Sequence, residues 1–248
     1  MTDRTDNNAI VVRGLKKRFG DREAVKGLNL DVKRGELFSL LGVNGAGKTT
    51  AIRMLSCLSS PTEGEAWIEG HSILSESGKV REVIGISMQE TAVAENLTVP
   101  ENLEFMARVA GESAKDAHRH ALELAETFGL GGHLKQSART LSGGLKRRLS
   151  IAMALISEPR VLFLDEPTLG LDVLARRELW DVIETLHGKV TVILTTHYLE
   201  EAEALSDRIG ILSEGTLTAL GTAAELKERA GKENFEDAFI AFARGEVR

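Results

Sequence analysis

The sequence predicts an α/β fold with a parallel sheet core, an N-terminal antiparallel β subdomain and an inserted helical subdomain. Short, largely apolar runs predict the core, because parallel strands are buried on both faces. Each run is followed at once, or within a few residues, by polar residues of chemical interest, and parallel sheets bind ligands at the carboxyl ends of their strands. The four predicted strands are Leu37–Leu41, Val83–Met88, Val161–Leu164 and Val190–Leu194.

Two other regions differ from this core. The segment Ile10–Val32 is β-like in pieces that glycines separate, which predicts a mostly antiparallel subdomain. From about Glu90 to Ser157 the composition is helical, with a break between helices at Gly129–Gly132. We therefore expect a single domain over residues 1–248. Its expected parts are a core that contains the sheet (1–89 and 158–221), a helical subdomain (90–157) and a helical C-terminal tail (222–248).

Composition limits the function. The chain has 248 residues, 42% apolar and 27% charged, as in ordinary globular proteins, so disorder over most of its length is excluded. Its net charge of −6 argues against a nucleic acid as partner. The single cysteine, Cys57, excludes a disulfide framework and a cysteine-based zinc site. We expect Cys57 to be a packed thiol in the helix after the first predicted core strand.

The sequence gives no sign of a membrane span. Residues 1–9 contain no apolar stretch, so we expect no secretory signal, and no run of 18 or more apolar residues occurs. If the protein serves a membrane process, a partner must supply the membrane part. In the tail, Phe235, Phe239 and Phe242 recur at helical spacing among acidic residues. We expect them to pack on their own domain or a partner, the alternative being insertion at a membrane interface.

The loop after the first core strand satisfies the pattern G-x-x-x-x-G-K-[ST] between a strand and a helix. Glycines let backbone N–H groups surround a phosphate, and the N-terminus of the following helix attracts the same anion. Lys48 would reach the β- and γ-phosphates, and Thr49 would bind Mg²⁺. A glycine-rich turn with a surface lysine is the alternative. The expected nucleotide contacts are Gly42, Asn44, Gly45, Ala46, Gly47, Lys48, Thr49 and Thr50.

Two carboxylates end another core strand. Asp165 is placed to hold Mg²⁺ opposite Thr49, because a carboxylate at a buried strand end must be paired or bind a cation. Glu166 could polarise the attacking water as a general base. The alternative is a solvated acidic pair before Pro167.

A helix is predicted to begin after Leu141-Ser142-Gly143-Gly144. Ser142 would lie near the N-cap, and the two glycines would expose backbone N–H groups. By itself this motif is only a helix start.

Together, these motifs resemble those of ATP-binding-cassette (ABC) ATPases, in the same order and over roughly Ile10 to Gly221. The resemblance implies a phosphate-loop NTPase fold of ABC type that binds ATP and Mg²⁺ and hydrolyses ATP. It also implies head-to-tail dimers with ATP at the interface. In such a dimer, Ser142, Gly143 and Gly144 of one chain would contact the γ-phosphate bound by Lys48 of the other.

The resemblance assigns further roles one residue at a time. Phe19 matches the aromatic residue that stacks on adenine. Gln89 matches the glutamine that touches Mg²⁺ and the attacking water, and His197 the histidine that contacts the γ-phosphate. Asp172 matches the loop that links the two sites across the dimer. Leu145 departs from the pattern, because a glutamine usually stands there.

The leading interpretation is the ATPase subunit of a membrane transporter, resembling exporters of drugs, antibiotics or cell-surface polymers. It implies separate polytopic membrane subunits, a second ABC ATPase chain, identical or different, and a cytoplasmic location on the inner face of the cell membrane. The alternative is a soluble ABC ATPase of an assembly system, such as iron–sulfur cluster scaffolding. The short stretch between Lys48 and Ser142 leaves no room for the coiled-coil arm of a DNA-repair ATPase.

The remaining charged runs are predicted to be solvent-exposed. They are Lys16-Lys17-Arg18, Lys146-Arg147-Arg148, and Glu200, Glu201 and Glu203.

Overall fold

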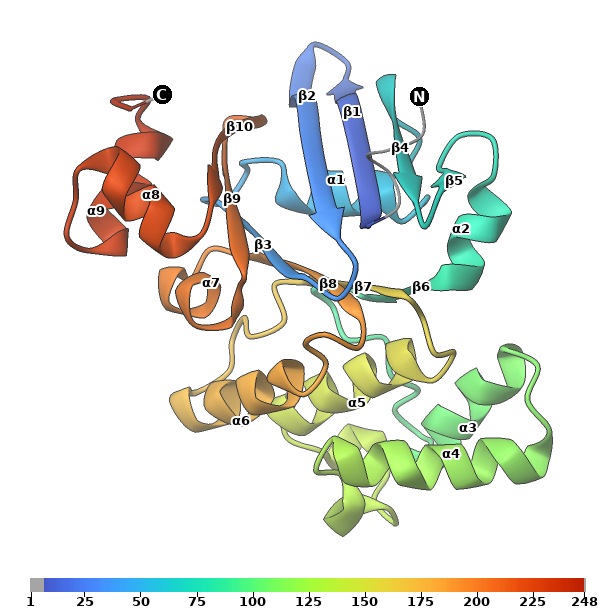
Figure 1. Ribbon diagram of the computed structural model, residues 1–248. Helices are drawn as coiled ribbons and strands as arrows, with labels where there is room; N and C mark the ends of the chain where they lie inside the picture. Colours follow the sequence, from blue (N-terminus) through green and yellow to red (C-terminus); the bar gives the residue numbers. More distant parts are fainter. Residues whose placement is uncertain (1–6, 248) are drawn as a thin grey trace.

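A six-stranded sheet crosses the middle of the molecule, in a computed structural model that describes residues 7–247 (Figure 1). The strand order is β10-β9-β3-β8-β7-β6, with parallel pairing except between β9 and β10. All four core strands predicted from the sequence are present, to within about two residues. The strands are β3 (Leu37–Leu41), β6 (Ile84–Ser87), β7 (Val161–Asp165), β8 (Thr191–Thr196), β9 (Arg208–Ser213) and β10 (Thr216–Gly221).

A second, antiparallel sheet has the order β2-β1-β4-β5. It consists of β1 (Asn8–Phe19), β2 (Arg22–Lys33), β4 (Glu63–Ile68) and β5 (His71–Ser72). The predicted antiparallel subdomain is confirmed, but its first two strands are long rather than broken into pieces. Gly14 marks a bulge in β1, where the register with β2 shifts, and its φ of 58° suits glycine.

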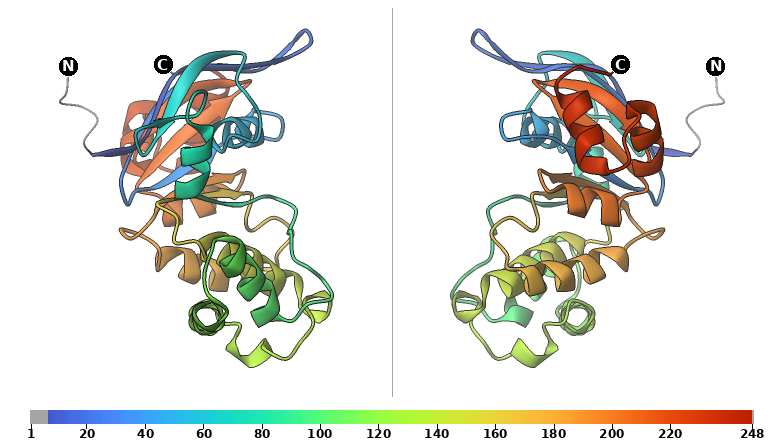
Figure 2. Two further views of the ribbon diagram at one scale, coloured as in Figure 1. Left: turned by 90° about the vertical axis from the view of Figure 1, so that its right-hand side faces the viewer. Right: turned by 90° about the vertical axis from the view of Figure 1, so that its left-hand side faces the viewer.

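Helices fill and cover the space around the sheets. Helix α1 (Lys48–Leu55) lies between the two sheets, and α2 (Ser77–Val83) leads into β6 (Figure 1). The helical region lies on one face of the six-stranded sheet, and the antiparallel sheet lies on the other (Figure 2). It contains α3 (Val99–Val109), α4 (Ala114–Thr127), the short 3₁₀ turns Gly131–His133 and Ala138–Thr140, and α5 (Gly143–Leu155); α6 (Val173–Glu184) runs beside it.

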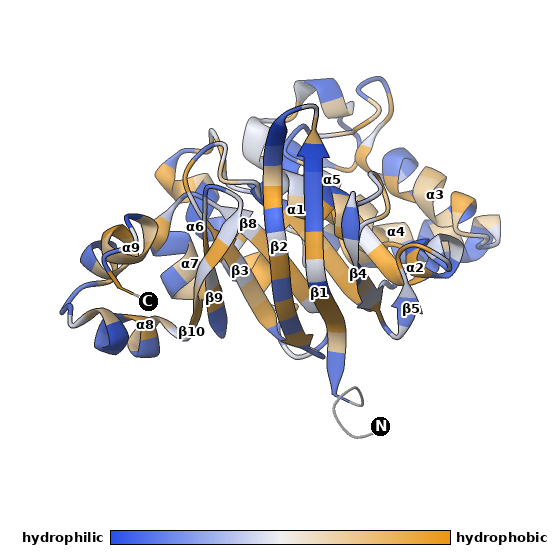
Figure 3. Ribbon diagram, turned by 90° about the horizontal axis from the view of Figure 1, so that it is seen from above, coloured by the Kyte–Doolittle hydropathy of each residue, from blue (hydrophilic) through white to orange (hydrophobic). Residues whose placement is uncertain are grey.

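The core strands are rich in apolar residues because each face of the sheet packs against its own apolar cluster. Phe38 and Phe163 point into the cluster that includes α1 and the antiparallel sheet. Leu37 and Leu162, one residue earlier in each strand, point into the cluster formed with α3 to α6. Figure 3 shows mostly apolar residues along β3 and polar ones at the tip of the β1–β2 hairpin. Because these strands are buried on both faces, their carboxyl ends, where the residues of the site lie, are held in place.

The tail folds onto the edge of the sheet. Helices α7 (Leu199–Leu205), α8 (Ala223–Ala230) and α9 (Phe235–Ala243) enclose a third cluster with β9. Phe235 and Phe242 are buried in it, and Phe239 packs against it. The aromatic stripe thus packs on its own domain, one of the two expected outcomes, and that packing covers the rings of Phe235 and Phe242. Within residues 7–247, no helix combines the length and the apolar character that crossing a membrane requires.

The expected position of Cys57 is wrong by two residues. Helix α1 ends at Leu55, and Cys57 follows it with a left-handed φ of 58°. The thiol still packs against an apolar cluster, and burial raises its pKa. The predicted role as a small packed side chain therefore holds.

Candidate nucleotide site

Lys48 opens α1 and lies almost wholly buried at the carboxyl end of β3. Gly47 caps the helix with φ 107°, and a Cβ there would lie 2.5 Å from the carbonyl oxygen of Ala24. The Lys48 ammonium donates hydrogen bonds to the carbonyl oxygens of Gly42 (2.6 Å) and Val43 (3.3 Å). The loop therefore folds back over the lysine, and the first N–H groups of α1, which have no acceptor within the helix, are suited to bind an anion.

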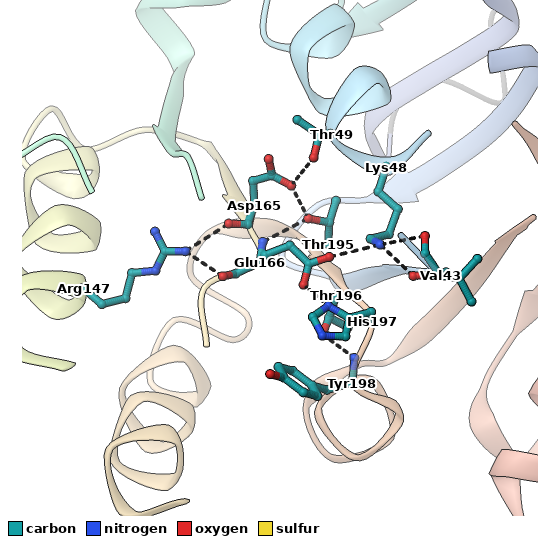
Figure 4. Close-up of polar contacts among 11 residues, drawn as sticks. Val43, Lys48, Thr49, Arg147, Asp165, Glu166, Thr195, Thr196, His197 and Tyr198 are labelled. Atoms are coloured by element: carbon teal, nitrogen blue, oxygen red, sulfur yellow. Dashed lines mark hydrogen bonds and ion pairs between the residues drawn. The ribbon is translucent and has the colours of Figure 1, made fainter. Parts of the chain in front are cut away.

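Asp165 ends β7 below this loop, beside Thr49 (Figure 4). Its Oδ1 accepts hydrogen bonds from the hydroxyls of Thr49 (3.1 Å) and Thr195 (2.5 Å). Its Oδ2 is buried and has no hydrogen-bond partner among residues 7–247. A carboxylate oxygen left bare in the interior is costly, and a hard divalent cation would relieve it. The residues present therefore fit Mg²⁺, with Thr49 and Asp165 as the side chains that would hold it, directly or through water.

Glu166 follows Asp165 in a left-handed conformation, with φ 48°. One carboxylate oxygen lies 3.0 Å from the Lys48 ammonium, and the other lies 2.6 Å from Nδ1 of His197 (Figure 4). The structure thus brings together three residues that stand far apart in the sequence, as the strand-end argument requires. In this arrangement the carboxylate is held between a cation and an imidazole.

These residues border a cleft of about 600 Å³. Gln89, exposed just after β6, lies on its wall, and Phe19, whose ring is 56% exposed, lies at one side. Arg22, which no sequence motif indicates, also lines the cleft near Gly45. Its place after a turn in the β1–β2 hairpin gives no sequence signal. The described lining comprises Phe19, Arg22, Ala24, Asn44, Gly45, Ala46, Gly47, Lys48, Thr49, Thr50, Gln89, Glu166, Leu169 and His197.

The other predicted contacts lie outside that lining. Ser142 caps α5 by accepting a hydrogen bond from the Leu145 N–H, as the motif predicts. Ser142 and Gly143 are exposed, and Gly143 borders a separate shallow pocket with Gln89. Asp172 caps α6 and accepts a hydrogen bond of 2.9 Å from the Ala175 N–H. One chain therefore places Ser142, Gly143, Gly144 and Asp172 outside the cleft that holds Lys48.

The expectation that Lys146-Arg147-Arg148 is a solvated face is wrong for two of its members. Arg147 is 3% exposed and donates hydrogen bonds to four backbone carbonyls around the site. The Arg148 side chain is largely covered and pairs with Glu178 on α6. Arg147 and Arg148 do not face solvent because other elements pack around most of the circumference of α5. The long side chains of arginine can then reach buried acceptors.

Glu201 is a second error. It was expected on the surface of α7 but is fully buried, where its Oε1 accepts a hydrogen bond of 3.0 Å from Nε1 of Trp180. Burial raises the pKa of Glu201, and the Trp180 hydrogen bond acts in the opposite direction. The neighbouring Glu200 is exposed, as expected.

The fold and the site define a phosphate-loop nucleotide-binding domain, and comparison with known proteins agrees. The family described as ABC transporter matches residues 25–169. A daunorubicin resistance ATP-binding protein of Streptomyces coeruleorubidus is 46% identical over 231 residues, which cover 93% of this chain and 73% of that protein. A doxorubicin resistance ATP-binding protein of Mycobacterium tuberculosis is 44% identical over 231 residues, 92% of this chain and 70% of that protein.

A solved structure also resembles the chain closely. It is the dimeric, post-hydrolysis state of an ATP-binding cassette with ADP and phosphate bound. It superposes with a TM-score of 0.77 at 29% identity, covering 86% of this chain and 98% of the other. The chain belongs to the ABC transporter family. It is an ATP-binding and ATP-hydrolysing subunit, and the alternative of a soluble assembly ATPase is not favoured.

Proposed function

We propose that this chain powers a membrane exporter of drug-like molecules by closing head to tail with a second ATPase chain around two ATP molecules. One observation carries the proposal. The cleft holds Lys48, Glu166 and His197, whereas Ser142 and Asp172 of the same chain lie outside it. A helix N-terminus with free N–H groups suits a γ-phosphate, so the exposed start of α5 is placed to complete the cleft of a partner.

Within the closed site, each residue has a defined task. Lys48 would neutralise the β- and γ-phosphates, and Phe19 would stack on adenine. Thr49, Asp165 and Gln89 would hold Mg²⁺, which would offset charge on the phosphates. Glu166 would accept a proton from the water that attacks the γ-phosphorus, with His197 on the phosphate, yielding ADP and phosphate. The contacts of Gly42, Asn44, Gly45, Ala46, Gly47 and Thr50 in cis, and of Ser142, Gly143, Gly144 and Asp172 in trans, remain predictions.

The organisation of the chain belongs to the same proposal. Residues 1–89 and 158–221 would form the ATP-binding core, 90–157 the subdomain that carries Ser142, and 222–248 the tail. Separate polytopic membrane subunits would hold the protein at the inner face of the cell membrane and form the path for the substrate. Export of a drug is supported by the names of two relatives, which are resistance proteins for daunorubicin and doxorubicin.

Glu166→Gln tests the ATPase part. The amide cannot take the proton, so the variant should bind ATP, keep it, and run as a dimer in ATP and a monomer in ADP, as measured by light scattering after gel filtration. Glu228→Gln, at an exposed position on α8, is the matched control and should behave as wild type. Wild-type turnover by Glu166→Gln would show that Glu166 is not the base.

Purification of the chain from detergent-solubilised membranes of its source tests the transporter part. A polytopic membrane protein should co-purify in a fixed ratio. Cells that carry Glu166→Gln should also accumulate more daunorubicin than wild-type cells. A soluble scaffold as partner, with no chain in the membranes, would overturn this part while leaving the ATPase assignment intact.

A further inference from the structure

Arg147 lies just over one turn into α5, on the buried side of the helix. Arg147, Ser150, Ile151 and Ala154 form one buried stripe at helical spacing. The Ser150 hydroxyl lies 3.0 Å from the Ser87 hydroxyl of β6. Further along, a Cβ at Gly85 would lie 2.2 Å from the Ala154 carbonyl oxygen, so α5 and β6 are packed backbone against backbone. The helix is therefore anchored along β6, and Arg147 lies at its end nearest the nucleotide site.

The Arg147 guanidinium bonds to main-chain carbonyl oxygens. Nε donates to Pro167 (2.7 Å), and Nη2 donates to Glu166 (2.7 Å) and Asp165 (3.1 Å). Nη1 donates to Met88, the residue before Gln89. One planar group thus holds the backbone on both sides of the Glu166 peptide unit and the start of the Gln89 loop. A lysine ammonium has fewer donors and no rigid fork, so it cannot span these four acceptors.

These hydrogen bonds influence the direction in which the Glu166 side chain points. Glu166 occupies a left-handed conformation, which is uncommon for a residue with a Cβ and costs about 1 kcal/mol or more. The carbonyls of residues 165, 166 and 167 are all fixed by Arg147. The same helix begins at Gly143, with Ser142 as its N-cap. Movement of the start of α5 is thereby tied to movement of the Glu166 backbone.

We propose that Arg147 is a positioning residue, which fixes the backbone that aims Glu166 and couples it to the end of α5 that meets the opposing nucleotide. The inference rests on the proposed function of the site. It assigns Arg147 no contact with ATP.

The test uses Arg147→Lys, with Arg148→Lys as the matched control next to it. For Arg147→Lys we expect kcat to fall about tenfold to a hundredfold, because a small displacement of a catalytic group has effects of this size. KM and the affinity for a fluorescent ATP analogue should stay within about threefold of wild type, since the binding loop is untouched. Arg148→Lys should leave kcat within about twofold of wild type, because a lysine can still form the ion pair with Glu178.

Arg147→Ala with added guanidinium ion provides a second readout. Millimolar guanidinium chloride should restore part of kcat relative to sodium chloride at equal ionic strength, and lysine variants should not respond. The proposal is overturned if Arg147→Lys keeps wild-type kcat. It is also overturned if kcat, ATP affinity and thermal stability fall together without any response to guanidinium, because that is the behaviour of a packing residue.

A mixed dimer separates the two halves of the proposal. One chain carries Arg147→Lys and the other Glu166→Gln, isolated through two different tags. The only site that retains Glu166 then has an altered Arg147 in the same chain and an unaltered α5 opposite. Activity well below that of a wild-type/Glu166→Gln mixed dimer supports positioning within the chain, whereas equal activity overturns it. Loss of ATPase activity in wild type, or its retention in Glu166→Gln, would instead reject the proposed function.

Discussion

The Lys48 ammonium lies 3.0 Å from one carboxylate oxygen of Glu166, with the two side chains only 5% and 7% exposed. His197 approaches the other oxygen at 2.6 Å. Lys48 therefore has a protein anion as its partner, and the phosphates of a nucleotide would compete with that anion for the lysine. The same lysine then has two measurable roles, one in the stability of the empty protein and one in ATP binding.

Lys48→Met should abolish ATP binding and also lower the free energy of unfolding of the nucleotide-free protein by about 1 to 3 kcal/mol, the cost of a buried polar group that loses its partner. Adding Glu166→Gln to Lys48→Met should recover most of that stability but none of the binding. Urea unfolding and titration with a fluorescent ATP analogue measure the two effects. Lys79→Met, at an exposed ion pair with Glu76, is the control and should change neither. Additive stability losses would show that the pair is not coupled.

Glu201→Gln should make the protein more stable at neutral pH. Burial raises the pKa of Glu201 above its ordinary 4.5, so the folded chain keeps its proton where the unfolded chain has lost it. Stability that depends on Glu201 therefore falls as pH rises from about 4.5 through the raised value. An amide stays neutral and can still accept the Trp180 hydrogen bond.

Thermal unfolding from pH 4.5 to pH 8 measures this effect. The melting temperature of Glu201→Gln should exceed that of wild type by about 2 to 4 °C for each kcal/mol gained, and the difference should vanish at the acid end. Glu200→Gln, exposed on the same helix, should track wild type at every pH. A difference that grows toward acid would contradict the assigned sign.

Leu145→Gln should alter ATP turnover only modestly. Leu145 is partly buried and packs against the apolar cluster under α5, so the amide gains at most one polar contact and loses some packing. One neutral hydrogen bond is worth about 1 kcal/mol, which corresponds to a rate change of about fivefold. Steady-state ATPase assays decide the matter, with Leu145→Met as the volume-matched control. An inactive wild type beside an active glutamine variant would mean that Leu145 disables the start of α5.

Phe242→Ala should destabilise the tail by about 3 to 5 kcal/mol, because the ring is fully buried and truncation leaves a cavity. Arg229 also lies over the ring, 5.3 Å from its centre. Since no described residue of the third cluster lines the cleft, KM for ATP should be unchanged. Urea unfolding and limited trypsin digestion provide the readouts, and Phe239→Ala at a half-buried position should cost less. Equal effects of both variants would contradict the packing described for α9.

Local sequence patterns predicted the site residues that follow the core strands. Lys48, Glu166 and His197 each follow an apolar run, and parallel pairing of the strands brings such residues to one edge whatever their separation in sequence. Arg147 and Glu201 could not be placed in this way. Whether a charged helix residue faces solvent depends on what packs around the helix, and for α5 and α7 the enclosing elements come from distant parts of the chain. For Arg22, no motif in the surrounding sequence indicates that it lines the cleft.

The bonds from Arg147 end on carbonyl oxygens, which every amino acid supplies. A change of side chain at residue 88 or 167 would leave them intact, so no compensating change at residue 147 would follow. Among related sequences, this connection would leave no correlated pair of substitutions. A physical link between the start of α5 and the backbone of Glu166 can therefore be invisible to any method that infers contacts from sequence covariation.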